Sequence, residues 1–426
     1  MLNIPQPIQT VVSYLKALRV TPVLVGGVVR DHIMVQLGYI EQIESYDWDI
    51  ELFIPENFEV ELLEALLASL GKLRIDNVGG RFPVWNLSID DLDIDFSLPR
   101  EETKIGETRK DFEVSIIKGT FSTELFKKAA NRRDFTIGAM GYNLITGDLL
   151  DPFNGAAHIK NKILVAVNSI TFKEDALRVL RGIRFSAKYD MIIDPDTYSL
   201  MHDLIPVMAI HTTKERISGE LLKMLDTKYT QRGVRYLRFL DLGHFLPLSN
   251  YGAHCFWWVA HQLSEFNDMM LISKIALFSL HYEEDAFFNL LQIGSTPERI
   301  ARFMRKKLLT IYKNEHEYLG NCREFLLELH DLGKKTNYTV DALLSLYRDV
   351  TRAIVRPDKA ADLFWQTEFF SNMNKDGWGK PFVTGKDLID VGYKQGPHLG
   401  EALKISRNLQ IQGYTKHEIL KWLTKA

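Results

Sequence analysis

The pattern of hydrophobic and polar positions along the chain changes near residue 150. Before that point, short runs typical of strands are interspersed with segments of helical spacing, and beyond residues 153–155 the spacing is helical almost to the end. Residues 100–115 are charged, lack a clear period and predict a flexible loop. The pattern therefore predicts a small head of strands and helices followed by a long helical body. The expected strands are 22–25, 47–53, 81–87 and 91–96, and the expected head helices are 28–38 and 58–70.

The composition is that of an ordinary globular protein: of 426 residues, 46% are hydrophobic and 25% are charged. These fractions exclude a disordered chain, a collagen-like repeat and a small disulfide scaffold. The two cysteines, Cys255 and Cys322, are too few and too far apart for a disulfide framework or a cysteine-based zinc site, which fits a reducing compartment. The net charge of -3 gives no whole-chain evidence for a polyanionic partner, but a single basic face is enough to hold one.

Two segments bear on targeting and membranes. The first, Met1 to Leu24, lacks the basic start, apolar stretch and cleavage site of a signal peptide. The second, Met269 to Leu280, is apolar but too short to span a bilayer, so it predicts a core helix. We therefore expect a cytoplasmic protein without a membrane partner. The sequence does not indicate its oligomeric state.

The strongest local signal is the pair of carboxylates in Asp47-Trp48-Asp49, about twenty residues after the Gly26-Gly27 turn. Residues two apart on a strand point the same way, and two carboxylates together suit magnesium. Paired glycines before a helix let the backbone approach an anion closely. Asp-x-Asp alone more often marks a solvated strand face. In the order strand, Gly-Gly, helix, strand, the motifs together indicate metal-assisted phosphoryl or nucleotidyl transfer.

Two further groups of charged residues suit a nucleotide. Arg132-Arg133-Asp134 offers guanidinium groups for phosphate oxygens, although a surface ion pair is the simpler interpretation. Asp175 and Arg178 lie three apart in a segment that reads as the start of a helix, where an intrahelical salt bridge is the default. The sharper hypothesis is a base reader, because a carboxylate accepts from the amine of cytosine or adenine while a guanidinium donates to the ring acceptor beside it.

These motifs and their order resemble the family of class II tRNA nucleotidyltransferases (CCA-adding enzymes) and bacterial poly(A) polymerases. The match covers about residues 20 to 225, and the segments 384–388 and 396–400 look like the tail of the CCA-adding members. No comparable match is found over residues 250–365. The matching segments are Val25–Asp31, Asp47–Asp49, Arg132–Ile137, Asp151–Gly155, Glu174–Arg181 and Glu215–Leu221.

The resemblance implies an α+β fold: a small mixed-sheet nucleotidyltransferase head followed by an all-α neck, body and tail. It implies that two Mg²⁺ ions held by Asp47 and Asp49 assist the in-line attack of a tRNA 3′-hydroxyl on the α-phosphorus of CTP or ATP, with release of pyrophosphate. It also implies that residues 215–221 support the base reader. The implied nucleotide ligands are Gly26, Gly27 and Arg30 along the triphosphate, Arg133 and Asp134 near the ribose, and Asp175 and Arg178 at the base. The implied domains are the head over 1–150, the neck with the base reader over 151–230, an RNA-binding body over 231–370 and a tRNA-binding tail over 371–426.

The resemblance favours addition or repair of the tRNA 3′-terminal CCA. The active-site motifs do not separate that activity from CC-only addition, A-only addition or poly(A) synthesis. A non-catalytic RNA-binding protein is the alternative from another class, and the intact Asp47, Asp49, Asp175 and Arg178 argue against it. One departure stands out: the family usually has Asn where this chain has Gly138, so an amide that could position nucleotide or backbone is missing.

Four other features of the sequence have a functional and a simpler structural interpretation. Asp93 and Asp95 are candidates for an extra acidic ligand, but an exposed strand face is the simpler interpretation. His330-Asp331 resembles the centre of an HD phosphohydrolase site without a convincing partner among the other histidines. Phe256 to Trp258 read as core. The tentative RNA-binding stripe lies on one helix, where a solvated face is the alternative, and consists of Arg299, Arg302 and Arg305 with Lys306 and Lys307.

Overall fold

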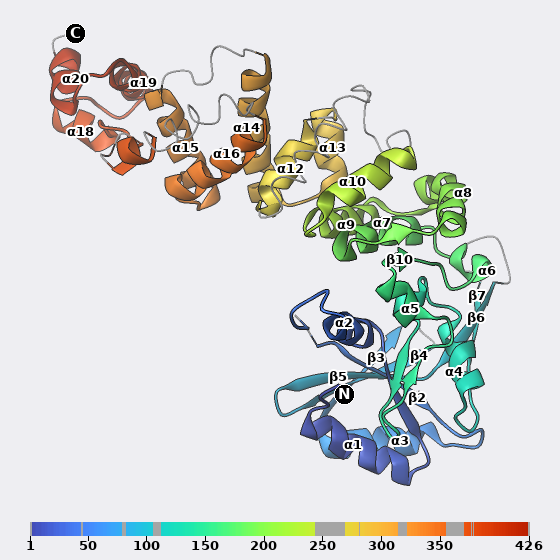
Figure 1. The fold of residues 1–426 in the computed structure, drawn as a ribbon. Helices are drawn as coiled ribbons and strands as arrows, with labels where there is room; N and C mark the ends of the chain where they lie inside the picture. The colour runs from blue at the N-terminus through green and yellow to red at the C-terminus, as the bar shows by residue number, and fades with distance from the viewer. Residues whose placement is uncertain are drawn as a thin grey trace. The chain divides into compact units, whose positions relative to one another are not determined.

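The strand-rich first part of the chain folds into one mixed sheet of seven strands in the computed structural model (Figure 1). The strand order is β3-β4-β5-β2-β1-β8-β9, in which β2 and β5 run parallel and the other neighbours run antiparallel. This arrangement confirms the α+β fold with a mixed-sheet head. The strands of this sheet are β1 (Thr21–Val25), β2 (Trp48–Phe53), β3 (Lys72–Val78), β4 (Phe82–Ile89), β5 (Leu92–Ser97), β8 (Gly141–Asn143) and β9 (Leu149–Leu150).

The structure describes residues 2–43, 46–78, 82–104, 112–242, 269–280, 282–313, 322–354, 370–375, 377 and 379–424. The aromatic segment 256–258 and Cys255 lie outside these ranges. The chain divides into two compact units, Met1–Arg216 and Ile217–Ala426, and each is described by itself. Helix α9 (Lys214–Leu225) contains the boundary between them.

Helices cover the sheet of the first unit on both sides. In Figure 1, α2 lies on one side of the sheet, and α1 and α3 lie on the other. The apolar side chains Val23, Phe53 and Phe126 form one core with the helix α4, and a Cβ at Gly141 would lie 2.7 Å from the Phe126 ring. The helices of this unit are α1 (Gln6–Ala17), α2 (Gly27–Gln36), α3 (Val60–Leu70), α4 (Thr123–Ala130), α5 (Gly155–Lys160), α6 (Ser169–Phe172), α7 (Arg178–Tyr189) and α8 (Pro195–His211), with a 3₁₀ turn η1 (Thr136–Gly138).

The prediction of a flexible loop over residues 100–115 is wrong at both ends. The strands β6 (Arg100–Lys104) and β7 (Phe112–Ile116) form a separate antiparallel pair. The Ser115 hydroxyl donates to Glu101 Oε1 across this pair at 3.1 Å, and Lys128 forms an ion pair with the same glutamate at 2.9 Å. Strand β6 consists only of charged and polar residues and shows no hydrophobic alternation. In β7, Phe112, Val114 and Ile116 alternate with polar residues, which is the signal that could have revealed the pair.

Among the described residues beyond residue 155, the expectation of an all-helical chain holds apart from one short strand pair. The strands β10 (Ile163–Leu164) and β11 (Ile192–Ile193) pair in parallel, with Leu164 opposite Ile193. Two-residue strands are too short to show a period of two in the sequence. Strand β3 was also not predicted.

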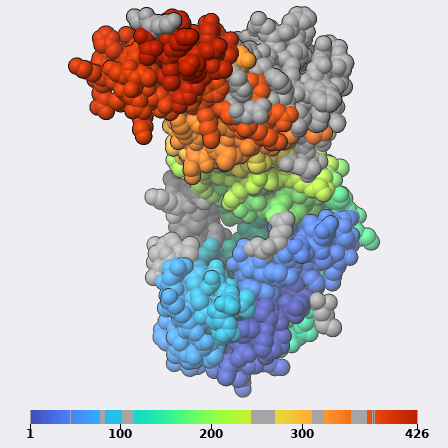
Figure 2. Space-filling view, turned by 90° about the vertical axis from the view of Figure 1, so that its left-hand side faces the viewer, coloured from blue at the N-terminus to red at the C-terminus, as the bar shows by residue number. Residues whose placement is uncertain are grey.

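The second unit is helical throughout its described part. Its last three helices enclose a small core of Leu388, Ile419 and Leu423. Figure 2 shows their surface in red as one continuous mass. The described helices that follow α9 are α10 (Thr230–Phe239), α12 (Leu271–Ser279), α13 (Glu284–Leu291), α14 (Ser295–Lys313), α15 (Cys322–Thr336), α16 (Val340–Ile354), α18 (Gly385–Asp390), α19 (Pro397–Gln412) and α20 (Lys416–Leu423).

Candidate active site

Acidic side chains gather on one face of strands β2 and β5. Asp47 is exposed and comes just before β2, while Asp49 lies on β2 and is partly buried. Asp49 is in parallel register with Asp95 of β5, so the two carboxylates are neighbours on the same face. Burial raises the pKa of Asp49 to about 6; Arg133 opposes this rise, and the charges of the other nearby carboxylates add to it. The ionised form of such a carboxylate is stabilised by a nearby cation.

The Gly26-Gly27 turn runs directly against Asp49. Gly26 has a φ of 84°, a conformation that residues with a side chain rarely adopt. A Cβ at Gly26 would lie 3.1 Å from Asp49 Oδ2, and a Cβ at Gly27 would lie 3.3 Å from an Arg30 nitrogen. Glycine at these positions therefore allows the backbone to lie next to the Asp49 carboxylate.

Arg30 connects the glycine turn to helix α7. Its Nε donates to Asp31 at 2.7 Å, and its guanidinium lies 4.7 Å from the Tyr189 ring centre and 5.7 Å from that of Phe185. The Tyr189 hydroxyl also lies 3.4 Å from Asp31 Oδ1. Arg30 thus makes contacts within the protein that fix α2 against α7.

The adjacent arginines of Arg132-Arg133-Asp134 share one buried partner. Arg132 Nη2 and Arg133 Nη2 both donate to Oε1 of Glu51 on β2, at 3.1 Å and 3.0 Å, and the Glu51 side chain is 3% exposed. Burial tends to raise the pKa of Glu51, but Arg133 and Arg132 outweigh it and hold the pKa below its usual value. The ion pair expected as the simpler alternative therefore exists, and it is buried next to Asp49.

Asp134 connects the same segment to α7. Its Oδ1 accepts the Phe135 backbone amide at 2.8 Å, and its Oδ2 accepts Arg181 Nε at 2.6 Å. Gly138 follows in the turn η1, where a Cβ would lie 3.8 Å from Asp134 Oδ1, an ordinary contact distance. The structure thus has room for a side chain at the position where this chain departs from the resemblance.

The predicted helix around Asp175 and Arg178 begins later than expected. Asp175 lies in a turn before α7, where its carbonyl accepts the Arg178 amide at 3.0 Å and its Oδ1 accepts the Leu177 amide at 3.2 Å. Aspartate competes with helical hydrogen bonding in this way, which explains the late start. The Asp175 Oδ2 accepts Arg216 Nη2 of α9 at 2.8 Å.

Arg178 makes its own contacts with the main chain. Its Nη1 donates to the Thr171 carbonyl, and its Nη2 donates to the Arg132 carbonyl at 2.8 Å. Burial lowers the pKa of Arg178 although nearby acids such as Asp134 oppose this, and the group remains a pure donor. The predicted base reader is therefore joined through Arg132 to the segment beside Asp49.

The Asp151–Gly155 motif holds helix α5 against the turn that follows Asp134. Asp151 caps α5 by accepting the amides of Gly155 and Ala156 at 2.6 Å and 3.0 Å. A Cβ at Gly155 would lie 2.4 Å from the Thr136 carbonyl oxygen. Glycine is therefore needed there for α5 to pack against the turn that follows Asp134.

The residues present suit a magnesium ion bound together with a substrate. Carboxylates are the ligands that this hard cation prefers, and Asp47, Asp49 and Asp95 lie at one edge of the site. Within the described ranges, no group of three or more His, Cys, Asp or Glu side chains converges closely enough to hold a metal ion alone. Magnesium in proteins usually combines one or two carboxylates with water and substrate phosphates, so a pair of carboxylates is the relevant protein ligand set.

Comparisons with known proteins agree with the geometry. A family model described as the poly A polymerase head domain matches residues 23–165, and one described as a probable RNA and SrmB- binding site of polymerase A matches residues 190–250. The chain is 26% identical over 371 residues to the CCA-adding enzyme of Streptococcus gordonii, covering 81% of this chain and 86% of that one. The chain thus carries the head domain of the poly(A) polymerase family over residues 23–165 and is similar to CCA-adding enzymes over most of its length. It is a nucleotidyltransferase.

Solved structures of CCA-adding enzymes share the fold of this nucleotidyltransferase. The Bacillus stearothermophilus enzyme in complex with CTP aligns with a TM-score of 0.69 and 22% identity, covering 99% of this chain and 98% of that one. The Thermotoga maritima enzyme complexed with tRNA-CCA aligns with a TM-score of 0.67 and 20% identity, covering 99% and 96%. These alignments extend the shared fold to the described helices between residues 269 and 354, where the sequence motifs gave no match.

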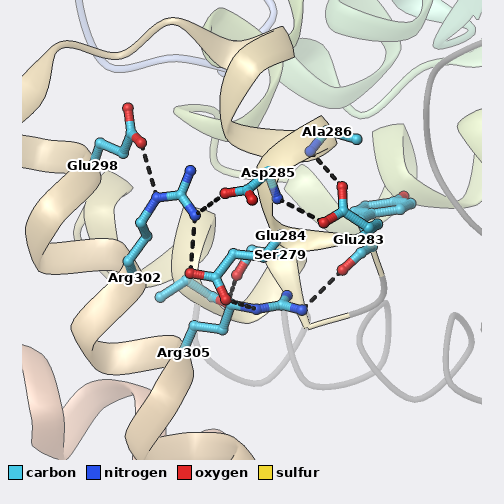
Figure 3. A network of polar contacts seen from close by, with 10 residues as sticks. Ser279, Glu283, Glu284, Asp285, Ala286, Glu298, Arg302 and Arg305 are labelled. Atoms are coloured by element: carbon cyan, nitrogen blue, oxygen red, sulfur yellow. Dashed lines mark hydrogen bonds and ion pairs between the residues drawn. The ribbon is translucent and has the colours of Figure 1, made fainter.

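In the candidate RNA-binding stripe of this nucleotidyltransferase, Arg302 and Arg305 make a network of contacts within the protein (Figure 3). Arg302 of α14 donates to Glu298, Glu284 and Asp285 at 2.8, 3.0 and 2.8 Å, and lies 4.4 Å from the centre of the Phe288 ring. These partners come from α14 itself and from α13. Arg302 therefore joins two helices of the second unit.

The burial of Arg305 is the clearest evidence against an open RNA-binding face. Its side chain is 7% exposed, and its Nη2 donates to the Tyr282 carbonyl at 2.9 Å. Arg299 donates to the Lys335 carbonyl at 3.0 Å, and Lys307 forms an ion pair with Glu328. A helical spacing of three brought these cations to one side of α14, but neighbouring helices pack against that side. The interpretation as an open RNA-binding face is wrong for Arg305.

The His330-Asp331 pair lies on α15, where Asp331 forms an ion pair with Arg407 of α19. Burial and the nearby Lys334 lower the pKa of His330, which favours its neutral form. No metal-binding group includes it among the described residues. The contacts of His330 and Asp331 within the protein therefore explain this motif as part of the packing of α15. Gly333, which follows it, also packs closely, since a Cβ there would lie 2.6 Å from the Tyr338 carbonyl oxygen.

Two features of the site were not selected from the sequence. Glu51 continues the alternation of Asp47 and Asp49 by one more step, which is the signal that could have revealed it. For Asp95 the sequence favours an exposed strand face, but the strand register places it beside Asp49, where Asn86 Nδ2 donates to its carboxylate.

In the described part of the chain, no helix is both long and apolar enough to cross a membrane.

Proposed function

We propose that this nucleotidyltransferase adds or repairs the 3′-terminal CCA of tRNA from CTP and ATP. The observation that carries the proposal is a continuous set of contacts within the first unit. Arg133 joins Glu51 on the strand of the acidic residues, and the preceding Arg132 carbonyl receives Arg178. A site for phosphate chemistry is thereby connected to a pair of side chains suited to reading a base. The names of the curated relatives support the same substrate.

The acidic edge would hold the metal. Asp47 and Asp49 are its ligands in this proposal, with Asp95 as a neighbour that adds negative charge. When bound, magnesium lowers the pKa of the attacking 3′-hydroxyl and balances the charge of the leaving pyrophosphate. The exposure of Asp47 leaves its carboxylate accessible to a bound substrate.

The triphosphate and ribose would lie between the glycine turn and the arginine pair. Gly26 and Gly27 allow phosphate oxygens to approach the backbone, since neither carries a Cβ. Arg133 keeps donors beyond the one that Glu51 accepts, and guanidinium groups match phosphate geometry. Arg30 would act mainly by holding the glycine turn against α7. Asp134 would lie near the ribose and would be kept in position by its contact with Arg181.

Asp175 and Arg178 would select the base. Asp175 supplies only acceptors and Arg178 only donors, so the pair suits an amine next to a ring acceptor, as in cytosine and adenine. Uracil and guanine would each leave a polar group unpaired, at a cost of about 1–3 kcal/mol. Arg216 would hold Asp175 in place from α9.

The proposal extends to the rest of the chain. We assign the head to residues 1–150, the neck to 151–230, the body to 231–370 and the tail to 371–426, and place tRNA binding in the body and tail. The RNA contacts of the body would be made by residues other than Arg302 and Arg305. The cytoplasm is the compartment that suits a tRNA substrate.

The direct test uses tRNA lacking all of CCA, its last two nucleotides or only the final A. Each is incubated with magnesium and labelled CTP, labelled ATP or both. Full CCA addition predicts incorporation into all three, with each nucleotide used in order. Asp49→Asn should reduce incorporation by more than about a hundredfold while the protein stays folded, because the metal ligand is lost. Incorporation of only one nucleotide would indicate a CC-adding or A-adding specialist, long A tracts a poly(A) polymerase, and binding without incorporation a non-catalytic protein.

A further inference from the structure

We propose that Glu51 is a positioning residue that sets the nucleotide site by holding Arg132 and Arg133 side by side. The inference deepens the proposed function and rests on it. Glu51 touches neither the base reader nor the glycine turn in the contacts described above, so its role is exerted through the two arginines.

The geometry of the three side chains is specific. Both arginines direct Nη2 to one and the same oxygen, Glu51 Oε1, at 3.1 Å and 3.0 Å. Glu51 lies two residues beyond Asp49 on β2, so its carboxylate points to the face that bears the acidic edge. A shared acceptor on a strand fixes the distance between two guanidinium groups, which long and flexible side chains would not fix themselves.

The charge of Glu51 matters as much as its shape. The Glu51 side chain is 3% exposed, and each arginine side chain is 23% exposed. Two cations on adjacent residues repel one another, and a buried carboxylate between them removes that repulsion. One carboxylate against two guanidinium groups leaves a net positive charge for a triphosphate to neutralise.

The same anchor reaches the base reader through the backbone. The Arg132 side chain is held by Glu51, while the Arg132 carbonyl accepts Arg178 Nη2 at 2.8 Å. Moving Arg132 therefore displaces an acceptor of Arg178. Glu51 is thus expected to influence first the affinity for the triphosphate and then the choice of base.

The test compares Glu51→Gln with a matched control, Glu64→Gln, on the full chain. Glu64 is another glutamate of the head, partly buried and accepting Trp85 Nε1 at 2.9 Å, but it lies on α3 away from the arginines. Glu51→Gln keeps the shape and removes the charge. We expect the KM for CTP and for ATP to rise about five- to tenfold, with kcat changed less than about twofold. Glu64→Gln should change neither. Calorimetric titration of CTP with magnesium should show the same loss of affinity, and this readout does not depend on transfer to tRNA.

A double-mutant cycle decides whether Glu51 acts through Arg133. In an Arg133→Ala background, Glu51→Gln should raise the dissociation constant for CTP by less than about twofold, because the group it positions is gone. An equal rise in both backgrounds, or no rise in the single variant, would overturn the proposal. If Glu51→Gln does not fold, Glu51→Asp replaces it: the charge is kept but the reach is one methylene shorter, and CTP affinity should again fall. Absence of tRNA extension by the wild type, with the CTP cycle as expected, would reject the proposed function and not this inference.

Discussion

At the scale of single residues, the two side chains of the base reader are held in different ways. Asp175 is held by another side chain, since Arg216 donates to its Oδ2 at 2.8 Å. Arg178 is held by main-chain oxygens of Thr171 and Arg132. Removing the Asp175 side chain therefore leaves the Arg216 cation in place. Removing Arg178 leaves the two carbonyl oxygens without its guanidinium as a donor. The two substitutions should thus have different kinetic signatures.

Asp175→Ala should relax discrimination against UTP more than it weakens triphosphate binding, because the phosphates are bound elsewhere. The expected change is about 1–3 kcal/mol in the CTP-over-UTP ratio of kcat/KM. The measurement is kcat/KM for all four nucleotides on one truncated tRNA. Arg216→Ala should shift the ratio in the same direction by a smaller amount, and Asp203→Ala, an exposed carboxylate of α8, should leave it unchanged. An equal loss for every nucleotide in Asp175→Ala would show a structural role alone.

Gly138→Asn should restore the family residue at little cost. A Cβ there would meet only Asp134 Oδ1, at 3.8 Å, so the free energy of unfolding should change by less than about 0.5 kcal/mol. If the amide helps to position ribose, the KM for CTP should fall. The contrasting substitution is Gly155→Ala, whose Cβ would lie 2.4 Å from a carbonyl oxygen and should destabilise the protein by about 1–3 kcal/mol. Chemical denaturation followed by circular dichroism measures both.

At the scale of elements, the tail depends on two helix caps. Thr384 and Asp387 form a capping box at α18, and Thr415 and Glu418 form another at α20. Lys416, the first residue of α20, donates to Asp387 Oδ1 at 2.7 Å. The two short helices therefore stabilise each other at their first turns.

This arrangement predicts a pH-dependent stability of the tail. The hydrogen bonds from Lys416 and then Thr384 lower the pKa of Asp387 from 3.8 to about 2. A lowered pKa means that the stabilisation is present above pH 3.8 and is lost as the pH falls towards 2. Since the Asp387 side chain is partly exposed to solvent, the contribution should not exceed about 1 kcal/mol. Asp387→Asn should speed hydrogen exchange of α18 amides at pH 7 relative to Asp390→Asn, and the difference should vanish near pH 2. A difference that persists at low pH would contradict the assigned cause.

The elements show why sequence reasoning succeeded in some places and failed in others. Strands β2 and β5 were predicted because their buried residues alternate with acids, as in Ile94 and Phe96 beside Asp95. The pair β6–β7 was not predicted because β6 is polar throughout, so the alternation of Phe112, Val114 and Ile116 in β7 had no apolar counterpart in the sequence. The position of Asp95 beside Asp49 depends on strand register, which a single strand does not reveal. Likewise, the cations of α14 read as a free face until α13 packs against Arg302.

At the scale of the whole molecule, the residues proposed for catalysis and base reading fall within one of the two units. The predicted catalytic and base-reading residues all lie within Met1–Arg216, whereas the Arg302 network lies within Ile217–Ala426. Domains with their own cores can unfold separately. We therefore expect ligands and substitutions to act on one unit at a time.

Calorimetric unfolding should show two transitions. CTP with magnesium should raise the midpoint of one transition only, because the nucleotide binds the first unit. Arg302→Gln should lower the midpoint of the other by breaking its contacts with Glu284 and Asp285, which are partly exposed and worth about 1 kcal/mol together. The control is Arg74→Gln, an exposed residue of β3 that pairs with Asp76. A single transition that both changes shift would show that the units unfold as one.

The helix α9 has a practical consequence for anyone who exchanges parts between relatives. The boundary between the units falls inside this helix, and Arg216, the last residue of the first unit, holds Asp175. A helix turns by about 100° per residue, so one residue inserted before Arg216 would swing its side chain off the aspartate. A chimaera joined at the apparent domain border would thus inherit a nucleotide preference altered by the splice. Joining after Leu225 leaves the helix whole, and the recipient should keep its own choice of base.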